Sequence, residues 1–476
     1  MSSVTDPKGT ISFTLPPDLV QYLSNLDAFI ADQITPLQSR NDNDRFFDHR
    51  REHARTDWDN QGLPRPEWED LLHQCVQLAD KAGFYRFSLP RQYGGQNDSP
   101  SGRGCNLWMA VIREHLAAKG LGLFNDLQTE HSVVGNFPDL LLVQWFGTKA
   151  QKEVLIPGRL EGRVRITFGL TEPGHGSDAT FMETRAVREV RGGVEGWRID
   201  GRKMWQTGMH RATHCLVFAR TAGRDGEAEG ISCFVVPREA EGVRVESYEW
   251  TLNMPTDHAT ISLHSVFLPD NPSSPTPTTP LPISPLLGPL HHGLQIAQAF
   301  VHENRLRQAA SSLGAARYCL SRSIAHARTR APFKKPLYQN QAVQFPLSEQ
   351  WTQVEMLELL IQKTAVEMDE VSAAMDAAST CGAAAGAGFE VAPQLSAMVS
   401  MCNFWSNRLC TQAADLAIQV HGGLGYSRHL PFEHLWRHHR RYRITEGSEE
   451  IQVRNVGRWL FGVRGGKAGK EGEAKL

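Results

Sequence analysis

The chain has 476 residues, too many for one small core, so we expect two or three domains. Apolar residues make up 41% and charged residues 21%, as in an ordinary globular protein. Fifty basic and 52 acidic side chains give a net charge of -2, which excludes a general electrostatic attraction to nucleic acid or anionic membranes. No apolar stretch is long enough to span a membrane. The eight cysteines are scattered without a CxxC pair, which fits a reducing compartment and no metal site.

The hydrophobic pattern changes along the chain. Residues 1–163 predict helices, because apolar residues recur three and four apart in segments such as PEWEDLLHQCVQLADKAG. Residues 164–268 contain short runs of β-branched and aromatic residues separated by Gly and Pro, which predict strands. Residues 269–290 are rich in proline and predict a linker. Helical periodicity returns over 291–462, and the polar tail 463–476 is expected to be disordered.

Two apolar stripes predict long helices in the last helical region. They consist of Ala309, Leu313, Ala316, Leu320 and Ile324, and of Leu347, Trp351, Val354, Leu357 and Ile361. Alanine and glycine dominate 373–388, which predicts a flexible connection between two such helices. The coarse order is therefore a helical domain, a β-domain and a second helical domain.

The most informative segment is FGLTEPGHGSD, residues 168–178, which follows a predicted strand. Its glycines let backbone N–H groups approach a ligand closely, and its hydroxyls can donate hydrogen bonds, so the loop suits a polyanionic or carbonyl-rich cofactor. An ordinary turn has a similar composition. The segment is neither a Walker A loop nor a GxGxxG motif.

Two later segments also give weak indications of a ligand-binding site. In GRKMWQTG, residues 201–208, Trp205 could stack on a ring while the hydroxyl of Thr207 meets its edge, although a core position for Trp205 is the simpler interpretation. In QVHGGLGY, residues 419–426, glycines again allow a close backbone approach. ITEGSEEIQ, residues 444–452, follows it.

Taken together with the segment ENRLRQAASSLGAARYCLSRSIAHARTRAPFKKPL, these motifs resemble the acyl-CoA dehydrogenases. TEPGHGSD is similar to their flavin-binding TEPxxGSD loop, GRKMWQTG to GxKxWITNG, QVHGGLGY to QxxGGxGY, and ITEGSEEIQ to the catalytic YEGTxxIQ. The resemblance covers roughly residues 60–462 in a consistent order. It implies an α+β fold with an N-terminal helical domain, a central β-barrel or sandwich domain, and a C-terminal four-helix bundle.

The resemblance implies FAD-dependent α,β-dehydrogenation of an acyl-CoA thioester to trans-2-enoyl-CoA. Glu446 matches the base that removes the α-proton while the β-hydride passes to flavin N5, and its backbone N–H would help to hold the thioester oxygen. A dry pocket should raise the pKa of this carboxyl group. Some members place the base where this chain has Asn304, which cannot serve, and Glu303 should point elsewhere on its helix.

The implied flavin site has two parts, one within the subunit and one from a neighbouring subunit. The first comprises Phe168, Leu170, Thr171, Gly176, Ser177, Trp205, Thr207, Ser448 and Glu450. The second comprises Arg330, Phe333, Gln341, Gln419, Gly422 and Gly423. Because the site is shared, we expect a homodimer or homotetramer. The residues implied to contact the acyl-CoA are Ser177, Arg305, Gly447 and Arg458.

The chain departs from the family pattern at several positions. Pro332 replaces Thr or Lys, which removes a hydroxyl contact to the flavin phosphates. Thr445 replaces the Tyr beside the base, which opens the pocket, and Ser448 replaces Thr. WRHHRRYR, residues 436–443, is more basic than usual and would bind phosphates or pair across a subunit interface.

Other functions fit the same scaffold. One is an acyl-CoA oxidase that uses O2, although the chain has no room after residue 462 for the extra domain of classical peroxisomal oxidases. Another is a flavin enzyme with a non-CoA substrate, such as a nitroalkane oxidase or a monooxygenase. Nitroalkane oxidases use an Asp base, so Glu446 argues against that reading. A flavin-binding but catalytically silent protein is a further alternative.

The two ends of the chain bear on localisation. MSSVTDPKGT lacks a signal-peptide core and an Arg-rich presequence, and the terminal Ala474-Lys475-Leu476 resembles a peroxisomal address. We therefore expect a peroxisomal protein, or otherwise a cytoplasmic one. The electron acceptor would be an electron-transfer flavoprotein, or mainly oxygen in a peroxisome.

Overall fold

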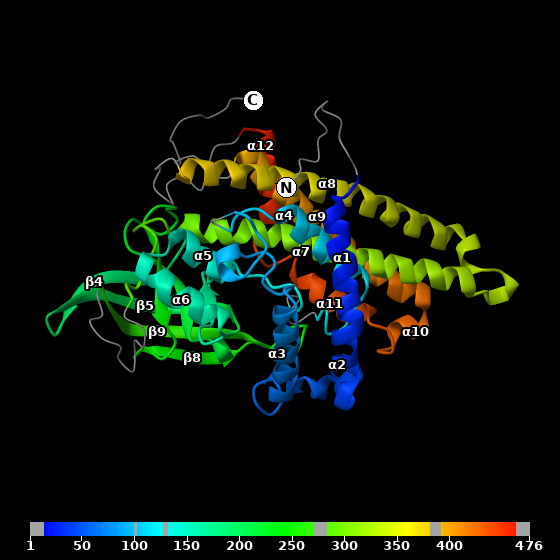
Figure 1. Ribbon diagram of the computed structural model, residues 1–476, viewed down its shortest axis with the longest axis horizontal. Helices are drawn as coiled ribbons and strands as arrows, with labels where there is room; N and C mark the ends of the chain where they lie inside the picture. Colours follow the sequence, from blue (N-terminus) through cyan, green and yellow to red (C-terminus); the bar gives the residue numbers. More distant parts are fainter. Residues whose placement is uncertain (1–13, 100–101, 127–131, 271–282, 381–391, 463–476) are drawn as a thin grey trace, which may run out of the picture.

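A computed structural model describes residues 14–99, 102–126, 132–270, 283–380 and 392–462 (Figure 1). Most of the proline-rich linker, part of the Ala- and Gly-rich connection and the polar tail with Ala474-Lys475-Leu476 lie outside these residues.

The N-terminal region is helical, as expected. Its helices are α1 (Pro17–Phe29), α2 (Thr35–Ser39), α3 (Pro66–Lys81), α4 (Asn106–Ala118), α5 (Pro138–Phe146) and α6 (Lys149–Leu160). The helices α1, α3 and α5 begin with proline, whose missing N–H costs nothing in a first turn. Helix α6 begins with a capping box, in which Gln151 N donates to Thr148 Oγ1 at 3.2 Å and Thr148 N donates to Gln151 Oε1 at 2.8 Å.

The central region is a sheet with the strand order β10-β7-β6-β4-β5-β9-β8, and β3 pairs in parallel with β6. Its strands are β3 (Ile166–Gly169), β4 (Arg185–Arg191), β5 (Val194–Thr207), β6 (His214–Arg220), β7 (Ile231–Pro237), β8 (Val243–Tyr248), β9 (His258–Pro269) and β10 (Leu286–Leu287). Every residue of β6 and β7 is buried, so these strands form the centre of the sheet domain. A separate small ribbon joins β1 (Thr56–Asp57) to β2 (Leu63–Pro64). Strand β10 lies within the predicted linker and pairs with β7.

Three long helices form the C-terminal bundle. They are α7 (Gly293–Thr329), α8 (Gln341–Thr380) and α9 (Pro393–His421), which contact one another. The short helices α10 (Gly423–Tyr426), α11 (Phe432–Arg441) and α12 (Glu449–Leu460) pack on α9. The loop between α11 and α12 carries Glu446.

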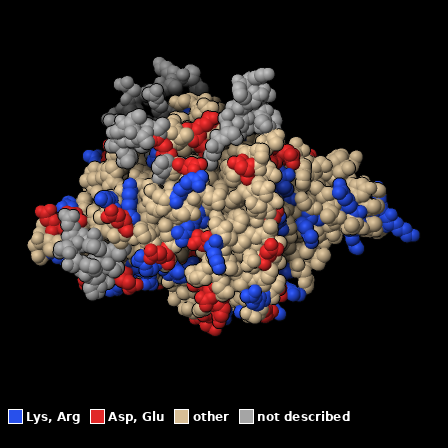
Figure 2. Space-filling model, in the orientation of Figure 1, with Lys and Arg blue, Asp and Glu red and all other residues tan. Residues whose placement is uncertain are grey.

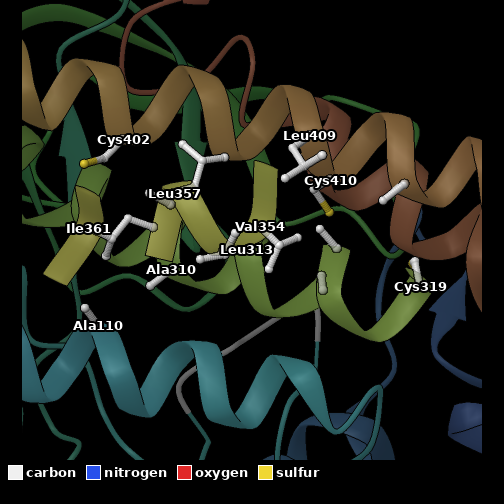
Figure 3. Packing of buried hydrophobic residues seen from close by; sticks show 14 of the residues in the cluster. Ala110, Ala310, Leu313, Cys319, Val354, Leu357, Ile361, Cys402, Leu409 and Cys410 are labelled. Carbon is white, nitrogen blue, oxygen red and sulfur yellow. The ribbon is translucent and has the colours of Figure 1, made fainter. Parts of the chain in front are cut away.

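Helix α4 of the N-terminal region belongs to the same core as this bundle. It contacts both α7 and α8. Figure 3 shows Ala110 of α4 facing Ala310 and Leu313 of α7, with Val354 of α8 and Leu409 of α9 completing the cluster. The N- and C-terminal helical regions are therefore packed together, and the sheet lies beside α7 (Figure 1).

The structure confirms the expected fold class, with helical regions on both sides of a central sheet domain. The predicted stripes face the core, with Trp351 and Ile324 partly buried and the other members buried. One boundary was wrong: the connection predicted from residue 373 begins later, because α8 continues to Thr380. Alanine favours the helix more than any other residue, so an alanine-rich stretch can extend a helix as readily as it can end one.

We expect Leu313→Ala to lower the free energy of unfolding by about 2–5 kcal/mol, because Leu313 is completely buried between helices and its truncation leaves a cavity. Urea denaturation followed by circular dichroism would measure the change. Val190→Ala on β4 is the control, since Val190 is 65% exposed and its truncation should change stability by less than about 0.5 kcal/mol. Equal effects of the two substitutions would contradict the packing shown in Figure 3.

Candidate active site

A cavity of about 3360 Å³ lies between the sheet, α3, α7 and the α11–α12 loop. It brings together segments that are far apart in the sequence. The predicted site residues that line it are Phe168, Leu170, Thr171, Gly176, Ser177, Trp205, Thr207, Arg305, Glu446, Gly447, Ser448 and Arg458. Glu450 does not line it.

The loop that follows β3 is held by a buried ion pair. Lys203 of β5 donates from Nζ to Glu172 Oε1 at 2.8 Å, and both side chains are nearly inaccessible to solvent. The same ammonium group donates to the carbonyl of Leu170 at 3.3 Å. The carboxylate of Glu172 also accepts from the backbone N–H groups of Glu183 and Thr184. Burial raises the pKa of Glu172, but Lys203 and these donors outweigh it and hold the pKa below its usual value.

The end of β5 presents an aromatic and a hydroxyl side chain to the cavity. Trp205 is 46% exposed and has a φ of 65°, a left-handed conformation that is costly for a bulky residue. Thr207 Oγ1 lies 3.0 Å from His258 Nδ1 on β9, and the rings of Trp205 and His258 are 6.3 Å apart. An exposed indole on a strained backbone indicates a functional position rather than the core position that we considered from the sequence.

The backbone of Glu446 is fixed by Arg305 of α7. Both Nε and Nη2 of Arg305 donate to the carbonyl oxygen of Glu446, at 2.8 and 2.6 Å. Glu446 has a φ of 57°, and Gly447 follows with a φ of 90°. The left-handed backbone angle favours glycine at position 447, and a Cβ there would lie 2.7 Å from Arg305 Nη2, so a side chain would displace the guanidinium.

The carboxyl group of Glu446 is poised to change charge near neutral pH. Burial raises its pKa to about 7, and the charges of Arg305 and Arg441 together with a hydrogen bond from Asn304 oppose that rise. Arg441 also lowers the pKa of His258, after the larger effect of burial, so its guanidinium lies near both walls of the cavity. A titratable carboxyl group thus lines the same cavity as Trp205 and Thr207.

Asn304 continues into a polar network that the sequence did not reveal. Asn136 Nδ2 donates to Asn304 Oδ1 at 3.0 Å, and Arg307 Nη1 donates to Asn136 Oδ1. Arg307 in turn pairs with Glu303 at 3.1 Å. Glu303 is buried and does not line the cavity. Burial raises the pKa of Glu303 more strongly than Arg307 and Arg103 lower it. The i, i+4 spacing of Glu303 and Arg307 was the one available signal for this network.

The second group of predicted flavin residues lies elsewhere. Arg330, Phe333, Gln341, Gln419, Gly422 and Gly423 do not line the cavity, and all are exposed. They lie near the turn from α7 to α8 and near the end of α9. These two helix ends are close together, since the rings of His326 on α7 and His421 on α9 stack at 4.3 Å. Figure 2 shows basic side chains projecting at the α7–α8 turn. Phe333 is fully exposed, with a φ of 55°.

The residues of the basic segment 436–443 are distributed between the cavity and acidic partners. Arg437, Arg440 and Arg441 line the cavity. Arg437 also pairs with Glu433 at 2.7 Å, and Arg443 pairs with Glu449 at 2.7 Å.

No helix among the described residues is long and apolar enough to cross a membrane.

Comparison with family models identifies the chain. Residues 167–266 match the middle domain of acyl-CoA dehydrogenases, and residues 291–461 match the C-terminal domain. The chain belongs to the acyl-CoA dehydrogenase family. Members of this family are FAD-dependent oxidoreductases.

Individual relatives agree with this assignment. The chain is 29% identical to a 3-(aryl)acrylate reductase from Clostridium sporogenes, over 80% of this chain and 88% of that protein. It is 28% identical to an acyl-CoA dehydrogenase from Bacillus subtilis, over 83% and 91%. The three-dimensional structure of butyryl-CoA dehydrogenase from Megasphaera elsdenii has the same fold, with a TM-score of 0.68, 22% identity, and coverage of 95% of this chain and 100% of that one.

The residues present fit the FAD that family members bind. Trp205 offers an exposed aromatic face, and the hydroxyls of Thr171, Ser177 and Thr207 line the same cavity. A Cβ at Gly176 would meet nothing within 4 Å, so the loop leaves open space there for a bound group. These residues would hold the ring system of the flavin. Arg305 and Arg458 remain predicted contacts of the CoA portion. Nε and Nη2 of Arg305 donate to the Glu446 carbonyl, and Arg458 is exposed.

We expect Lys203→Met to destabilise the loop after β3, because it leaves the Glu172 carboxylate buried without its counter-charge. Breaking a buried ion pair from one side costs about 3–5 kcal/mol. Thermal unfolding together with the FAD content of the purified protein would show both the loss of stability and the loss of cofactor.

The double variant Lys203→Met with Glu172→Gln is the matched control, because it removes both charges of the buried pair and its single amide oxygen can still accept from one of the N–H groups of Glu183 and Thr184. It should recover part of the stability. A single variant as stable as the original protein would show that the pair does not hold the loop.

Proposed function

We propose that this protein catalyses the α,β-dehydrogenation of an acyl-CoA thioester to a trans-2-enoyl-CoA, with Glu446 as the base. The observation that carries the proposal is the position of Glu446: its carboxyl group has a pKa of about 7 and lies in the cavity that Trp205 and Thr207 also line. A general base works best when its pKa is near the operating pH. Bound FAD would accept the hydride of the β-carbon.

The residues around Glu446 support this role. Arg305 fixes the backbone on which the carboxyl group stands, so the base is oriented before substrate arrives. Arg441 favours the ionised form, which is the form that can take the α-proton. The backbone N–H of Glu446 is our proposed donor to the thioester oxygen, where negative charge develops as the proton leaves.

We further propose that the active assembly is an oligomer in which Arg330, Phe333, Gln341, Gln419, Gly422 and Gly423 complete a neighbouring subunit's flavin site. The separation of these residues from their own cavity supports the proposal. A fully exposed Phe333 on a strained backbone is costly in an isolated subunit and is explained if another molecule covers it.

The electron acceptor distinguishes a dehydrogenase from an oxidase on this scaffold. We propose a dehydrogenase, in line with the family models and the Bacillus subtilis relative. Stopped-flow reoxidation of the reduced protein tests this choice, because rapid reaction with O2 would identify an oxidase.

We expect Glu446→Gln to lower kcat by about 100- to 10,000-fold, the usual contribution of a positioned base. The amide keeps the shape of the side chain, so FAD content and thermal stability should not change. Glu349→Gln is the matched control, because Glu349 is exposed on α8 and does not line the cavity, and it should keep full activity. Normal turnover of the Glu446 variant would refute the assignment of the base.

The pH profile gives a second test of Glu446. Only the ionised carboxyl group can accept a proton, so kcat/KM should fall as pH drops below about 7 and level off above it. Arg441→Leu removes a charge that lowers the pKa of Glu446, and the inflection should therefore move to higher pH. An unchanged inflection in this variant would show that another group controls the profile.

A further inference from the structure

The wall of the cavity beyond Glu446 is formed by one face of α7. Asn304, Gln308 and Ser311 recur at i, i+4 and i+7, so they share that face, and all three line the cavity. The stripe from Asn304 to Ser311 extends for about 10 Å along the helix. Because Asn304 contacts the Glu446 carboxyl group, the stripe starts at the proposed base and leads away from it.

This wall is polar in a place where a hydrocarbon chain would need apolar contacts. Arg307 and Asn136 also line it, and they are held in a network with Glu303 that fixes their positions. Arg113 of α4 lines the same cavity and is 2% exposed. Two guanidinium groups and three amide side chains therefore line the cavity that contains the base.

Gln308 supplies a specific reason to expect a polar ligand. Its Oε1 atom is buried and has no hydrogen-bond partner among the described residues. A buried carbonyl oxygen without a hydrogen-bond partner costs free energy, and an alkyl chain packed against Gln308 would offer it no partner. A ligand hydroxyl could donate to Gln308 Oε1, whereas a ligand carboxylate could accept from Gln308 Nε2 and from the hydroxyl of Ser311.

We propose that the acyl group of the substrate carries an oxygen substituent, a hydroxyl or a carboxylate, that binds against Gln308, Ser311 and Arg307. This inference rests on the proposed function, since it assumes that an acyl-CoA enters past Glu446. The acyl group then runs along α7 with its α-carbon at Glu446 and its oxygen at the polar stripe. An unsubstituted alkyl chain of the same length binds more weakly, because it desolvates the stripe without replacing its hydrogen bonds.

Equilibrium binding to the FAD-loaded Glu446→Gln protein tests the proposal without turnover. The probes are hexanoyl-CoA, 6-hydroxyhexanoyl-CoA and adipoyl-CoA, which differ only at the end of a six-carbon chain. We expect calorimetry to show that at least one oxygen-bearing thioester binds about tenfold tighter than hexanoyl-CoA, roughly the contribution of one hydrogen bond. The tighter of the two identifies the substituent.

Gln308→Leu, made in the same protein, should reduce this preference to less than about threefold. Gln298→Leu is the matched control, because Gln298 lies on the same helix and lines the cavity on the other side of Asn304. It should keep the preference. Loss of the preference in both variants would overturn the assignment to the stripe.

Hexanoyl-CoA binding as tightly as the other two thioesters would overturn the inference, and so would binding of none of them. The proposed function is judged separately, by anaerobic bleaching of the original protein with each thioester. Preferential binding without bleaching would reject the dehydrogenation and leave the inference standing.

Discussion

Two hydrogen bonds from one guanidinium to one carbonyl oxygen organise the centre of this molecule. Arg305 projects from α7 and holds the backbone of Glu446, which is left-handed and followed by a glycine that is left-handed as well. A left-handed residue with a side chain persists only where its surroundings fix it. Because α7 also contacts the sheet, α4, α8 and α9, this contact ties the α11–α12 loop to the centre of the molecule, and Asn407 of α9 adds a hydrogen bond to the carbonyl of Tyr442 in the same loop.

Opposing effects on the carboxyl group of Glu446 determine its protonation state. Burial favours the neutral acid, while Arg305, Arg441 and Asn304 favour the ionised form, and the pKa of about 7 is the balance of these effects. The buried carboxyl group of Glu172 is subject to opposing effects as well, but Lys203 and the N–H groups of Glu183 and Thr184 outweigh burial and hold its pKa below the usual value. One carboxylate is therefore structural and the other is free to change its protonation.

Resemblance to the motifs of the family identified several residues that share the cavity, although no periodic pattern in the sequence singles them out. Glu446, Trp205 and the loop after β3 were found in this way. The link between Asn136 and Asn304 could not be found, since a side-chain contact between a loop and a distant helix leaves no periodic signal. The end of α8 was misplaced because alanine-rich sequence is compatible with both helix and connection.

The position of α4 has a consequence for how the chain acquires its structure. This helix is complete once residue 118 has been synthesised, yet its core partners are α7 and α8, which begin at residues 293 and 341. During translation its apolar side chains, such as Ala110 and Leu107, have no native surface to cover them. The face of α4 that packs on α7 and α8 therefore stays uncovered during synthesis until most of the polypeptide has been made.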